Sequence, residues 1–519
     1  MQLPANQYAT GMQHKLLNRF GGLNRTNAFS DGEFREMCGL TTARYPYLST
    51  WDGMQKVEDL PFGDNLFAWD DLIYTKNGKL YIGDTEVCSV AAGKKQFAVV
   101  NTALVVWPDK IVVSLTDKSY RKMDVSISGS GAFTTNFKLQ ITPPDGKTLR
   151  ELFTVGDRLT ITGATGDLES NNRKRWKLTD IHDDTQELEF EGTEQNPPFP
   201  ALGIAAAITV AREIPDMDYI CAHNNRIFGC SSSEKLIFAS ALGDPMNWYD
   251  YDGLSTDAAY LPVASAGDFT GMISYGSVLM LFKEDEMIRL YGDQPSEYGY
   301  FRYVVKGVQA GCADSLQIVN NALYYKGRLG IYEYTGSTPQ LISYPLGDTV
   351  YTGCDCACVD NRFYWLAMTR ADGRKELLRY DTLMELWSSL DYTGAEDMVY
   401  FAGDTYLLRG GVLYRTDTAG ETVAYTAELC AFDEGTMNRK DYCHLLLRLT
   451  VEGTCSLQIR EEDGTWIERK RIDACERDVI SIPLQPMRKD RISVRFVGTG
   501  KLEVEEMQRE YIYRNEVPL

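Results

Sequence analysis

The sequence has few residues for several common kinds of chemistry. Histidine occurs four times in 519 residues, and no Cys-x-x-Cys motif is present. The longest apolar stretch of note, residues 201–211, is too short to cross a bilayer, and the first residues lack the basic then apolar pattern of a secretory signal. We therefore expect a chain that is made in a cytosol, does not insert into a membrane and keeps its twelve cysteines reduced.

Basic charge is also in short supply. Lysine and arginine total 53 against 73 aspartates and glutamates, which gives a formal charge of −20. Such a chain repels phosphate backbones, so we expect no specific nucleic-acid binding. Two local basic runs, residues 173–175 and 469–471, sit beside strand-like stretches with acidic neighbours and are interpreted as solvated strand or turn faces.

Apolar residues are plentiful, and their pattern is that of β-structure. They make up 44% of the chain and aromatics 11%, which is ample for a folded protein. Between residues 315 and 415, two apolar runs joined by a short polar turn recur three times, with turns at Asn320, Asp360 and Gly403. A spacing of about 40 residues is typical of four-stranded propeller blades.

The same hairpin pattern continues toward the N-terminus. Apolar runs flank Asn, Asp or Gly turns in residues 279–291, 219–228, 105–113 and 72–82. Counting these hairpins predicts an all-β propeller of six or seven blades, without the recurring signature of a WD40 array. A large two-sheet β-protein with evenly spaced hairpins is the alternative.

Other segments have their own patterns and suggest further domains. Residues 153–163 alternate strictly between apolar and polar, as in a small barrel of SH3-like or OB-like type, and residues 31–37 are compatible with a short capped helix. The predicted domains are an N-terminal arm over residues 1–60 laid on another surface, a propeller over 61–123 and 213–418, an inserted small β-barrel over 124–212, and a C-terminal β-sandwich over 419–519.

The cysteines Cys354, Cys356 and Cys358 form the most noticeable cluster of possible metal ligands. Thiolates bind zinc well. However, residues two apart on a strand point the same way, so three sulfurs in a row need a fourth ligand from elsewhere to complete a tetrahedron. We interpret them as small core residues and predict no metal and no cofactor.

No catalytic residue can be selected from the sequence. His14, His182, His223 and His444 fall in four separate segments, and His223, in a hairpin turn, is the most plausible member of a catalytic group. Carboxylate pairs occur at residues 70–71 and 183–184, but the side chains of adjacent residues on a strand or turn point in different directions. Nothing in the sequence selects a pair at the separation that a glycosidase requires. Residues 462–466 resemble a sialidase Asp box superficially but lack its inserted residue, and we interpret them as a hairpin turn. No glycine-rich phosphate loop occurs.

The densest aromatic segment is residues 242–251, which includes Trp248, Tyr249 and Tyr251 beside Asp250. Aromatic rings near carboxylates can stack on sugars, and they can equally cover the edge of a sheet. A structural use is favoured.

Several of these segments together resemble one family. Residues 20–26, 32–37 and 45–49, the alternating stretch 155–163, and above all residues 224–230 followed by 237–248 resemble tailed-bacteriophage virion proteins. The family includes proteins called stabilisation or tail-tube-associated proteins, and related nozzle proteins are propellers. Residues 49–53 replace basic residues that are common in the family's arm.

The resemblance implies a non-enzymatic structural component of a virion, in the tail or at the head-tail junction, that assembles as a ring of identical copies with other virion proteins. An acidic surface would then keep DNA from sticking to a conduit, and removal of residues 1–55 would leave a soluble monomer unable to join particles. The alternative is a glycan-binding or glycan-hydrolysing propeller of the tail tip that acts on the host surface.

Overall fold

The structure is a computed structural model that describes residues 11–61, 63–418 and 422–513. It confirms the all-β prediction: the described residues form forty-two strands, and their one α-helix is the short α1 (Leu149–Leu152). None of the described helices is long and apolar enough to cross a membrane. The chain divides into two compact units, residues 1–77 with 308–519, and residues 78–307, which are described separately.

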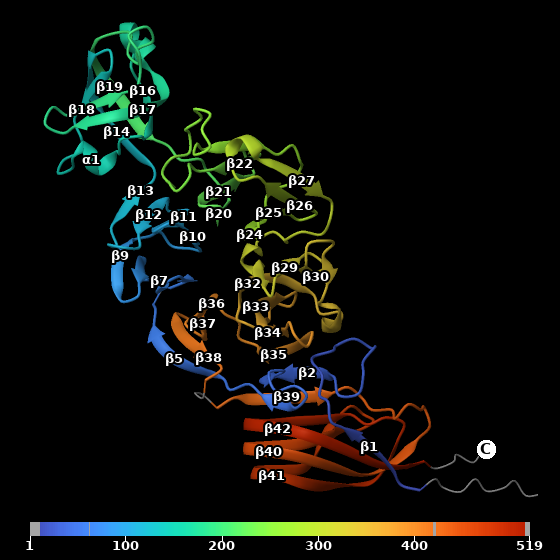
Figure 1. Cartoon of the computed structure of the whole chain (residues 1–519). Coiled ribbons are helices and arrows are strands. Elements are labelled where there is room, and N and C mark those ends of the chain that lie inside the picture. Colours follow the sequence, from blue (N-terminus) through green and yellow to red (C-terminus); the bar gives the residue numbers. More distant parts are fainter. Residues whose placement is uncertain (1–10, 62, 419–421, 514–519) are drawn as a thin grey trace, which may run out of the picture. The chain divides into compact units, whose positions relative to one another are not determined.

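The first unit contains three complete four-stranded antiparallel sheets (Figure 1). Their strands are β28 (Gln317–Val319), β29 (Ala322–Gly327), β30 (Gly330–Tyr334) and β31 (Gln340–Leu341); β32 (Tyr351–Val359), β33 (Phe363–Arg370), β34 (Lys375–Asp381) and β35 (Leu386–Asp391); and β36 (Asp397–Phe401), β37 (Asp404–Arg409), β38 (Val412–Thr416) and β5 (Met54–Asp59). The hairpin turn between β28 and β29 has Asn320 and Asn321 at positive φ, as the sequence pattern predicts.

Neighbouring sheets of the first unit touch through their first strands. β28 contacts β32, β32 contacts β36, and β36 contacts β6 (Leu66–Ala68). Between the second and third sheets, Cys356, Trp365, Leu377, Met398 and Leu407 form a buried core. Each sheet therefore buries its face against the next one, as blades of a propeller do.

Strand β5 belongs to the third sheet, although the other three strands of that sheet lie at residues 397–416. It pairs with β38, for example Glu58 opposite Leu413. Residues 54–59 thus complete a four-stranded sheet in the same chain, whereas the sequence assigns them to an arm.

The rest of the arm is also part of a sheet. One eight-stranded sheet joins β1 (Gln13–Leu17), β2 (Phe34–Cys38), β3 (Leu40–Thr41), β4 (Leu48–Thr50), β39 (Ala424–Leu429), β40 (Lys440–Arg460), β41 (Trp466–Lys489) and β42 (Val494–Tyr513). In Figure 1 the blue β2 lies beside the orange β39, and β42, β40 and β41 follow one another.

Two predictions are wrong here. Residues 31–37 are not a helix, because Phe34 and Met37 are buried in a strand that pairs with β39, and this long-range pairing overrides the local capping signal. The C-terminal domain is not a sandwich built from residues 419–519 alone, because hydrogen bonds connect its strands in one sheet and half of the eight strands come from the N-terminal segment.

The long strands β40 and β42 pass each other at two glycines. Gly453 lies opposite Gly500, with φ values of 120° and 90°. A Cβ atom on Gly500 would collide with the carbonyl oxygen of Glu452, and one on Gly453 with that of Thr499. Both positions therefore require glycine.

The second unit contains three further complete four-stranded sheets. They are β10 (Gln96–Val100), β11 (Ala103–Trp107), β12 (Ile111–Ser114) and β13 (Tyr120–Lys122); β20 (Tyr219–His223), β21 (Arg226–Ser231), β22 (Leu236–Ala239) and β23 (Ala259–Pro262); and β24 (Gly271–Tyr275), β25 (Val278–Lys283), β26 (Glu286–Tyr291) and β27 (Gly299–Tyr303). β10 contacts β20, and β20 contacts β24. A seventh sheet has the order β6, β7 (Leu72–Lys76), β8 (Lys79–Ile82) and β9 (Thr85–Ser89); its first two strands belong to the first unit and its last two to the second.

A closed barrel is inserted in the second unit at the segment where the sequence alternates. Its strands are β14 (Val125–Thr135), β15 (Lys138–Ile141), β16 (Arg158–Thr162), β17 (Arg173–His182), β18 (Glu187–Phe190) and β19 (Gly203–Arg212). Phe199, from the proline-rich run after β18, is fully buried against Phe133 and Phe190, so that run fills the barrel core.

Candidate functional site

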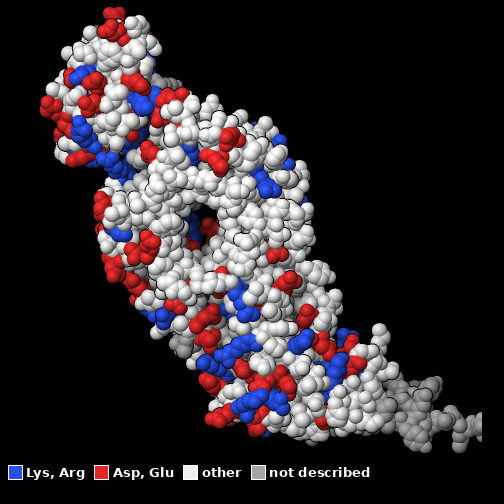
Figure 2. Space-filling view, in the orientation of Figure 1, with Lys and Arg blue, Asp and Glu red and all other residues white. Residues whose placement is uncertain are grey.

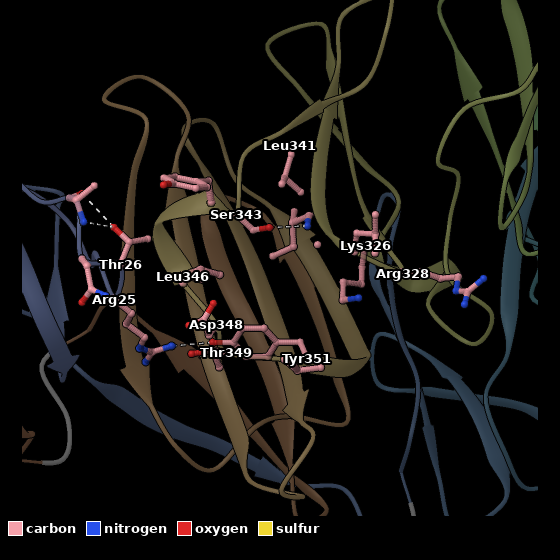
Figure 3. Close-up of a pocket in the computed structure, with 18 of the residues that line it drawn as sticks. Arg25, Thr26, Lys326, Arg328, Leu341, Ser343, Leu346, Asp348, Thr349 and Tyr351 are labelled. Atoms are coloured by element: carbon pink, nitrogen blue, oxygen red, sulfur yellow. Dashed lines mark hydrogen bonds between the residues drawn. The ribbon is translucent and has the colours of Figure 1, made fainter.

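In the first unit, a groove of about 980 Å³ lies beside the sheet β28–β31. One wall is the N-terminal segment at residues 25–28 and Arg35, and the other is the β29–β30 hairpin at residues 326–331. Residues 341–351 form the remaining lining. Figure 3 shows Arg25 and Thr26 on one side and Lys326 and Arg328 on the opposite side.

The groove lies where the fourth strand of its sheet is short. β31 has two residues, and it pairs with β30 only through Tyr332 and Glu333. At Ile331 the edge of β30 is occupied by side-chain and backbone groups, because the Ile331 N–H donates to Ser343 Oγ at 2.9 Å and its carbonyl accepts from Ile342 N. A bound molecule would therefore meet side chains there and not a free strand edge.

The rim of the groove is apolar and exposed. Leu329 is 72% exposed, Tyr344 65% and Val350 62%. Leu341 is exposed as well. Large exposed apolar side chains gathered at one concavity are typical of a surface that binds another molecule.

The charges that line the groove are mostly positive. Arg25, Arg35, Lys326 and Arg328 are set against one acidic lining residue, Asp348. Arg35 is exposed and donates to the carbonyl oxygen of Thr26 at 3.1 Å. By residue type the lining is more basic than the chain as a whole, whose net charge is −20, although Arg25 is itself paired with Glu376.

A buried carboxylate holds the N-terminal wall in place. Glu376 of β34 is fully buried and accepts hydrogen bonds from Arg25 at 2.7 Å, from the Tyr351 hydroxyl at 2.6 Å, from Arg370 at 2.8 Å and from Ser389 at 2.8 Å. Burial alone would raise the pKa of Glu376, but Arg25, Tyr351 and Arg370 more than offset it, so its pKa is lowered. The same pairing raises the pKa of Arg25 against the effect of its burial.

Lys326 is buried beneath the opposite wall. Its Nζ donates to Gln309 Oε1 at 2.7 Å and to the carbonyl oxygen of Gly327 at 2.5 Å. Burial lowers its pKa, while Cys312 and Cys354 act in the opposite direction. Its contacts tie the hairpin to the preceding loop, so we assign it a structural role.

The three clustered cysteines do not converge. A register shift lies between Cys354 and Cys356, and only Cys356 and Cys358 are in the core between the sheets of β32 and β36. Burial raises the pKa of Cys354 and of Cys358 well above the usual thiol value. Within residues 11–61, 63–418 and 422–513, no group of three or more potential ligands is placed to hold a metal ion.

The structure brings two histidines together that the sequence keeps apart. His14 of β1 and His444 of β40 lie on either side of Glu510 of β42, with Nδ1 to carboxylate distances of 3.1 and 3.4 Å. Sequence reasoning missed this because the three strands are paired only in the folded sheet. His182 contacts Glu189 at 3.2 Å within the barrel.

His223 does not form a catalytic triad. It is buried, and its Nδ1 lies 2.8 Å from Ser274 Oγ, while its ring packs against Phe228. Burial lowers its pKa, although the nearby Asp293 acts in the opposite direction. A buried imidazole held between two strands is better suited to joining β20 and β24 than to reaching a substrate.

The remaining motifs occupy turns and loops. Residues 462–466 lie in the β40–β41 turn, where Asp463 Oδ1 accepts from Thr465 N at 2.9 Å, in agreement with the hairpin interpretation. Asp183 accepts from Leu149 N at 2.9 Å at the start of α1. Asp70 and Asp71 are exposed in a turn. In the aromatic segment, Trp248 is buried and donates to the carbonyl of Pro245 at 2.8 Å.

The first strands of the seven four-stranded sheets carry few acids. Within these described strands the carboxylates are Asp355 of β32 and Asp397 of β36. Asp355 accepts from Lys375 Nζ at 2.6 Å, and Asp397 accepts from Leu66 N at 2.7 Å. Both are engaged in contacts that hold strands together.

Comparisons with known proteins do not place the chain in a family. No family model matches it, and no curated protein matches it. A structure of PorZ, a surface component of the type-IX secretion system of Porphyromonas gingivalis, is 11% identical over 83% of this chain and 75% of its own, with a TM-score of 0.27. An exo-beta-1,3-galactanase from Phanerochaete chrysosporium is 10% identical over 55% and 92%, with a TM-score of 0.21. A mutant of the family 29 carbohydrate-binding module CBM29-2 is 13% identical over 22% and 74%, with a TM-score of 0.14. These scores carry no argument about fold or function.

Proposed function

We propose that this chain is a non-catalytic assembly module that docks a partner protein, and that its setting is the virion of a tailed bacteriophage, in the tail or at the head-tail junction. The observation that carries the proposal is the groove beside β28–β31, with its exposed apolar rim and basic lining. The phage setting rests on the sequence resemblance at residues 20–49, 155–163 and 224–248.

The non-catalytic part of the proposal is supported by the first strands. A propeller glycosidase needs two facing carboxylates, one to protonate the leaving group and one to attack or activate water. Here Asp355 is paired with Lys375, and Asp397 receives a backbone N–H. Both carboxylates are thus used in contacts between strands.

The architecture that we propose is a ring of seven blades. Each of the seven sheets has four antiparallel strands, and first strands of successive sheets touch within each unit. Closing a circle of such sheets buries every sheet face and removes exposed ends. β5 completes the sheet of β36–β38. Its pairing with β38 would close the ring, because β5 precedes the other strands of the seven sheets in sequence and β38 follows them.

The surface of the C-terminal sheet does not favour an acidic lining for a DNA conduit. On the face shown in Figure 2, lysine and arginine side chains are interspersed with acidic ones over the C-terminal sheet. The net charge of −20 is therefore not spread as a uniform acidic layer on that sheet.

The phage setting is tested by mass spectrometry of density-gradient-purified particles from a lysate that contains this gene product. We expect the chain to band with the particles in a fixed ratio to the major capsid protein and to remain after a high-salt wash. A chain found only in the soluble fraction would contradict the setting.

A second candidate function is glycan binding, the alternative that the sequence leaves open. Tyr344 is 65% exposed at the groove rim, close to Asp348 along the chain, and an exposed ring beside a polar group can stack on a sugar. Binding to a glycan array that is lost in Tyr344→Ala would favour this candidate over protein docking.

A further inference from the structure

We infer that β27, the last strand of the sheet β24–β27, pairs antiparallel with β27 of a second copy of this chain. The surface belongs to the second unit, and none of its residues lines the groove. Three features of β27 support the pairing: an open edge, a row of exposed rings on one face, and a sequence that matches itself.

The outer edge of β27 is open. β27 is the last strand in the order of its sheet, and it pairs with β26 from Gly299 opposite Tyr291 to Tyr303 opposite Met287 (Figure 1). In the described part of the chain, no backbone group of residues 299–304 forms a hydrogen bond on the side away from β26. Such a row of N–H and C=O groups is a template for another strand.

The last strands of the other six four-stranded sheets are protected in different ways. β31 has two residues, β13 has three of which two are charged, and half of the residues of β5 are charged. The exposed residues of β9 are polar, and β23 ends at Pro262, which has no N–H to donate. On β35 the carbonyl oxygens of Trp387 and Leu390 accept from the N–H groups of Leu23 and Gly39, at 2.7 and 2.8 Å. β27 has none of these features.

One face of β27 carries exposed aromatic rings. Phe301 is 59% exposed, and Tyr291 and Tyr303 are 40% and 39% exposed. The rings of Tyr291 and Phe301 are stacked, with centroids 5.2 Å apart. A Cβ atom on Gly299 would collide with the Tyr291 hydroxyl, so the Tyr291 ring lies over Gly299, and residues 299, 301 and 303 share one face of the strand. An apolar surface of this kind at an open edge is typical of a protein contact.

The face with the rings is its own complement. With a two-fold axis at Phe301, the two Phe301 side chains lie opposite each other. Gly299, covered by Tyr291, then lies opposite Tyr303 of the second copy. The rings of both copies thus form one cluster, and aromatic pairs across strands stabilise a sheet.

The charge on β27 fixes the same register. Arg302 is the one charged residue of the strand, and it is paired with Glu286 of β26. With the axis at Phe301, Arg302 lies opposite the uncharged Tyr300 of the second copy. An axis at Arg302 would place two like charges opposite each other, which is unfavourable.

The size of the contact predicts a reversible dimer. Full burial of an aromatic side chain removes roughly 150–250 Å² from solvent, so three rings per copy that are about half exposed contribute on the order of 500 Å² in total. Small interfaces, below about 1,200 Å², belong to weak and transient complexes. We therefore expect a dissociation constant roughly in the micromolar range.

The experiment follows the full-length protein by sedimentation velocity over a range of concentrations. The test variants are Phe301→Asp and Phe301→Lys, each alone and both mixed in equal amounts, because a charge on the axis meets the same charge in the second copy. The controls are Tyr260→Asp, on the outer strand β23, and Tyr344→Asp, at the rim of the groove; both tyrosines are more than half exposed.

We expect the native protein and both controls to show the same concentration-dependent dimer. Phe301→Asp and Phe301→Lys should each weaken self-association about tenfold or more, and the mixture should restore it, since opposite charges then lie across the axis. Circular dichroism of each variant shows that a loss of pairing is not unfolding.

A native chain that stays monomeric at every concentration would overturn the inference. So would a dimer that is unchanged in Phe301→Asp, or a mixture that pairs no better than either variant alone. Association that is lost in Tyr344→Asp and kept in Phe301→Asp would place the contact at the groove and would overturn it as well. None of these results depends on whether the chain bands with particles.

Discussion

Arg25, in the N-terminal segment, donates to the fully buried carboxylate of Glu376 on β34 at 2.7 Å, across 351 residues of sequence. The pair joins one wall of the groove to the sheet β32–β35. It shows how the N-terminal segment is built into the fold of its own chain, where the sequence suggests an arm laid over another surface.

Breaking this pair should destabilise the first unit. In Arg25→Met the buried Glu376 loses one of its two arginine partners, and we expect a loss on the order of 3 kcal/mol in the free energy of unfolding. The matched control is Arg374→Met, whose partner Asp372 is exposed and whose loss should cost less than about 1 kcal/mol. Urea denaturation followed by tryptophan fluorescence measures both, and equal stabilities for the two variants would contradict the assignment.

The same carboxylate gives a pH dependence with a defined sign. The folded pKa of Glu376 is lower than the ordinary value of 4.5, so its contribution is fully present above that value and is lost as pH falls through the folded pKa. Stability measured from pH 7 down to acid should therefore fall below pH 4.5. In Glu376→Gln this part of the acid dependence should be absent; an identical pH profile for the variant would show that Glu376 does not contribute.

The paired glycines of the C-terminal sheet should not tolerate a side chain. Gly500→Ala adds a Cβ that collides with the carbonyl of Glu452 at a position with φ of 90°. We expect a loss of about 2 kcal/mol or more from backbone strain and the forced shift of β40. Gly464→Ala is the control, because its φ is also 90° but the nearest contact of its Cβ is the Arg460 side chain at 3.8 Å. Thermal unfolding that shifts equally in both variants would rule out the close approach as the cause.

The barrel should fold alone. Its core of seventeen buried residues lies entirely within residues 127–210, and all six strands pair with one another. A fragment of residues 124–213 should give a dispersed NMR spectrum and a cooperative melt. Replacement of the buried Leu159 by Asp should abolish both. A fragment that stays unfolded under native conditions would show that the barrel needs the sheets around it.

The strand pairing changes what truncation of the N-terminal segment should do. The sequence predicts that removal of residues 1–55 leaves a soluble monomer. In the structure, however, β1 and β4 pair with β42, β2 pairs with β39, β3 pairs with β4, and β5 starts at Met54. We now expect the truncated chain to be largely insoluble, because the long edges of β42 and β39 and the edge of β38 would be exposed. Removal of residues 1–10 deletes none of these strands and serves as the control. Soluble, cooperatively folding protein after the longer deletion would contradict this view.

The sequence predicts local features well. Turns at Asn320 and Asn224 and the alternating stretch around Leu159 carry their structural signal within a few residues, and the structure has hairpins and a barrel there. It fails for the N-terminal segment, because Phe34 is a strand residue only when Leu429 lies opposite it. The local signal for a helix at residues 31–37 is weaker than that pairing.

The groove could not be predicted for the same physical reason. Its walls come from residues 25–35 and 326–351, which no periodicity connects. The one available signal was the resemblance at residues 20–26, which pointed to that segment without a role for Arg25. Likewise, His14 and His444 become neighbours only through Glu510 on the strand between them.

The central claim, that the groove holds a partner protein, is tested most directly by photo-crosslinking from a photoreactive amino acid placed at position 344 of the full-length chain within purified particles. The account predicts adducts with one other protein, and their loss when Leu341→Ser, a change of the exposed apolar rim, is combined with the crosslinker. Particles that contain the chain but yield no protein adduct from position 344, or adducts that persist in Leu341→Ser, would contradict it.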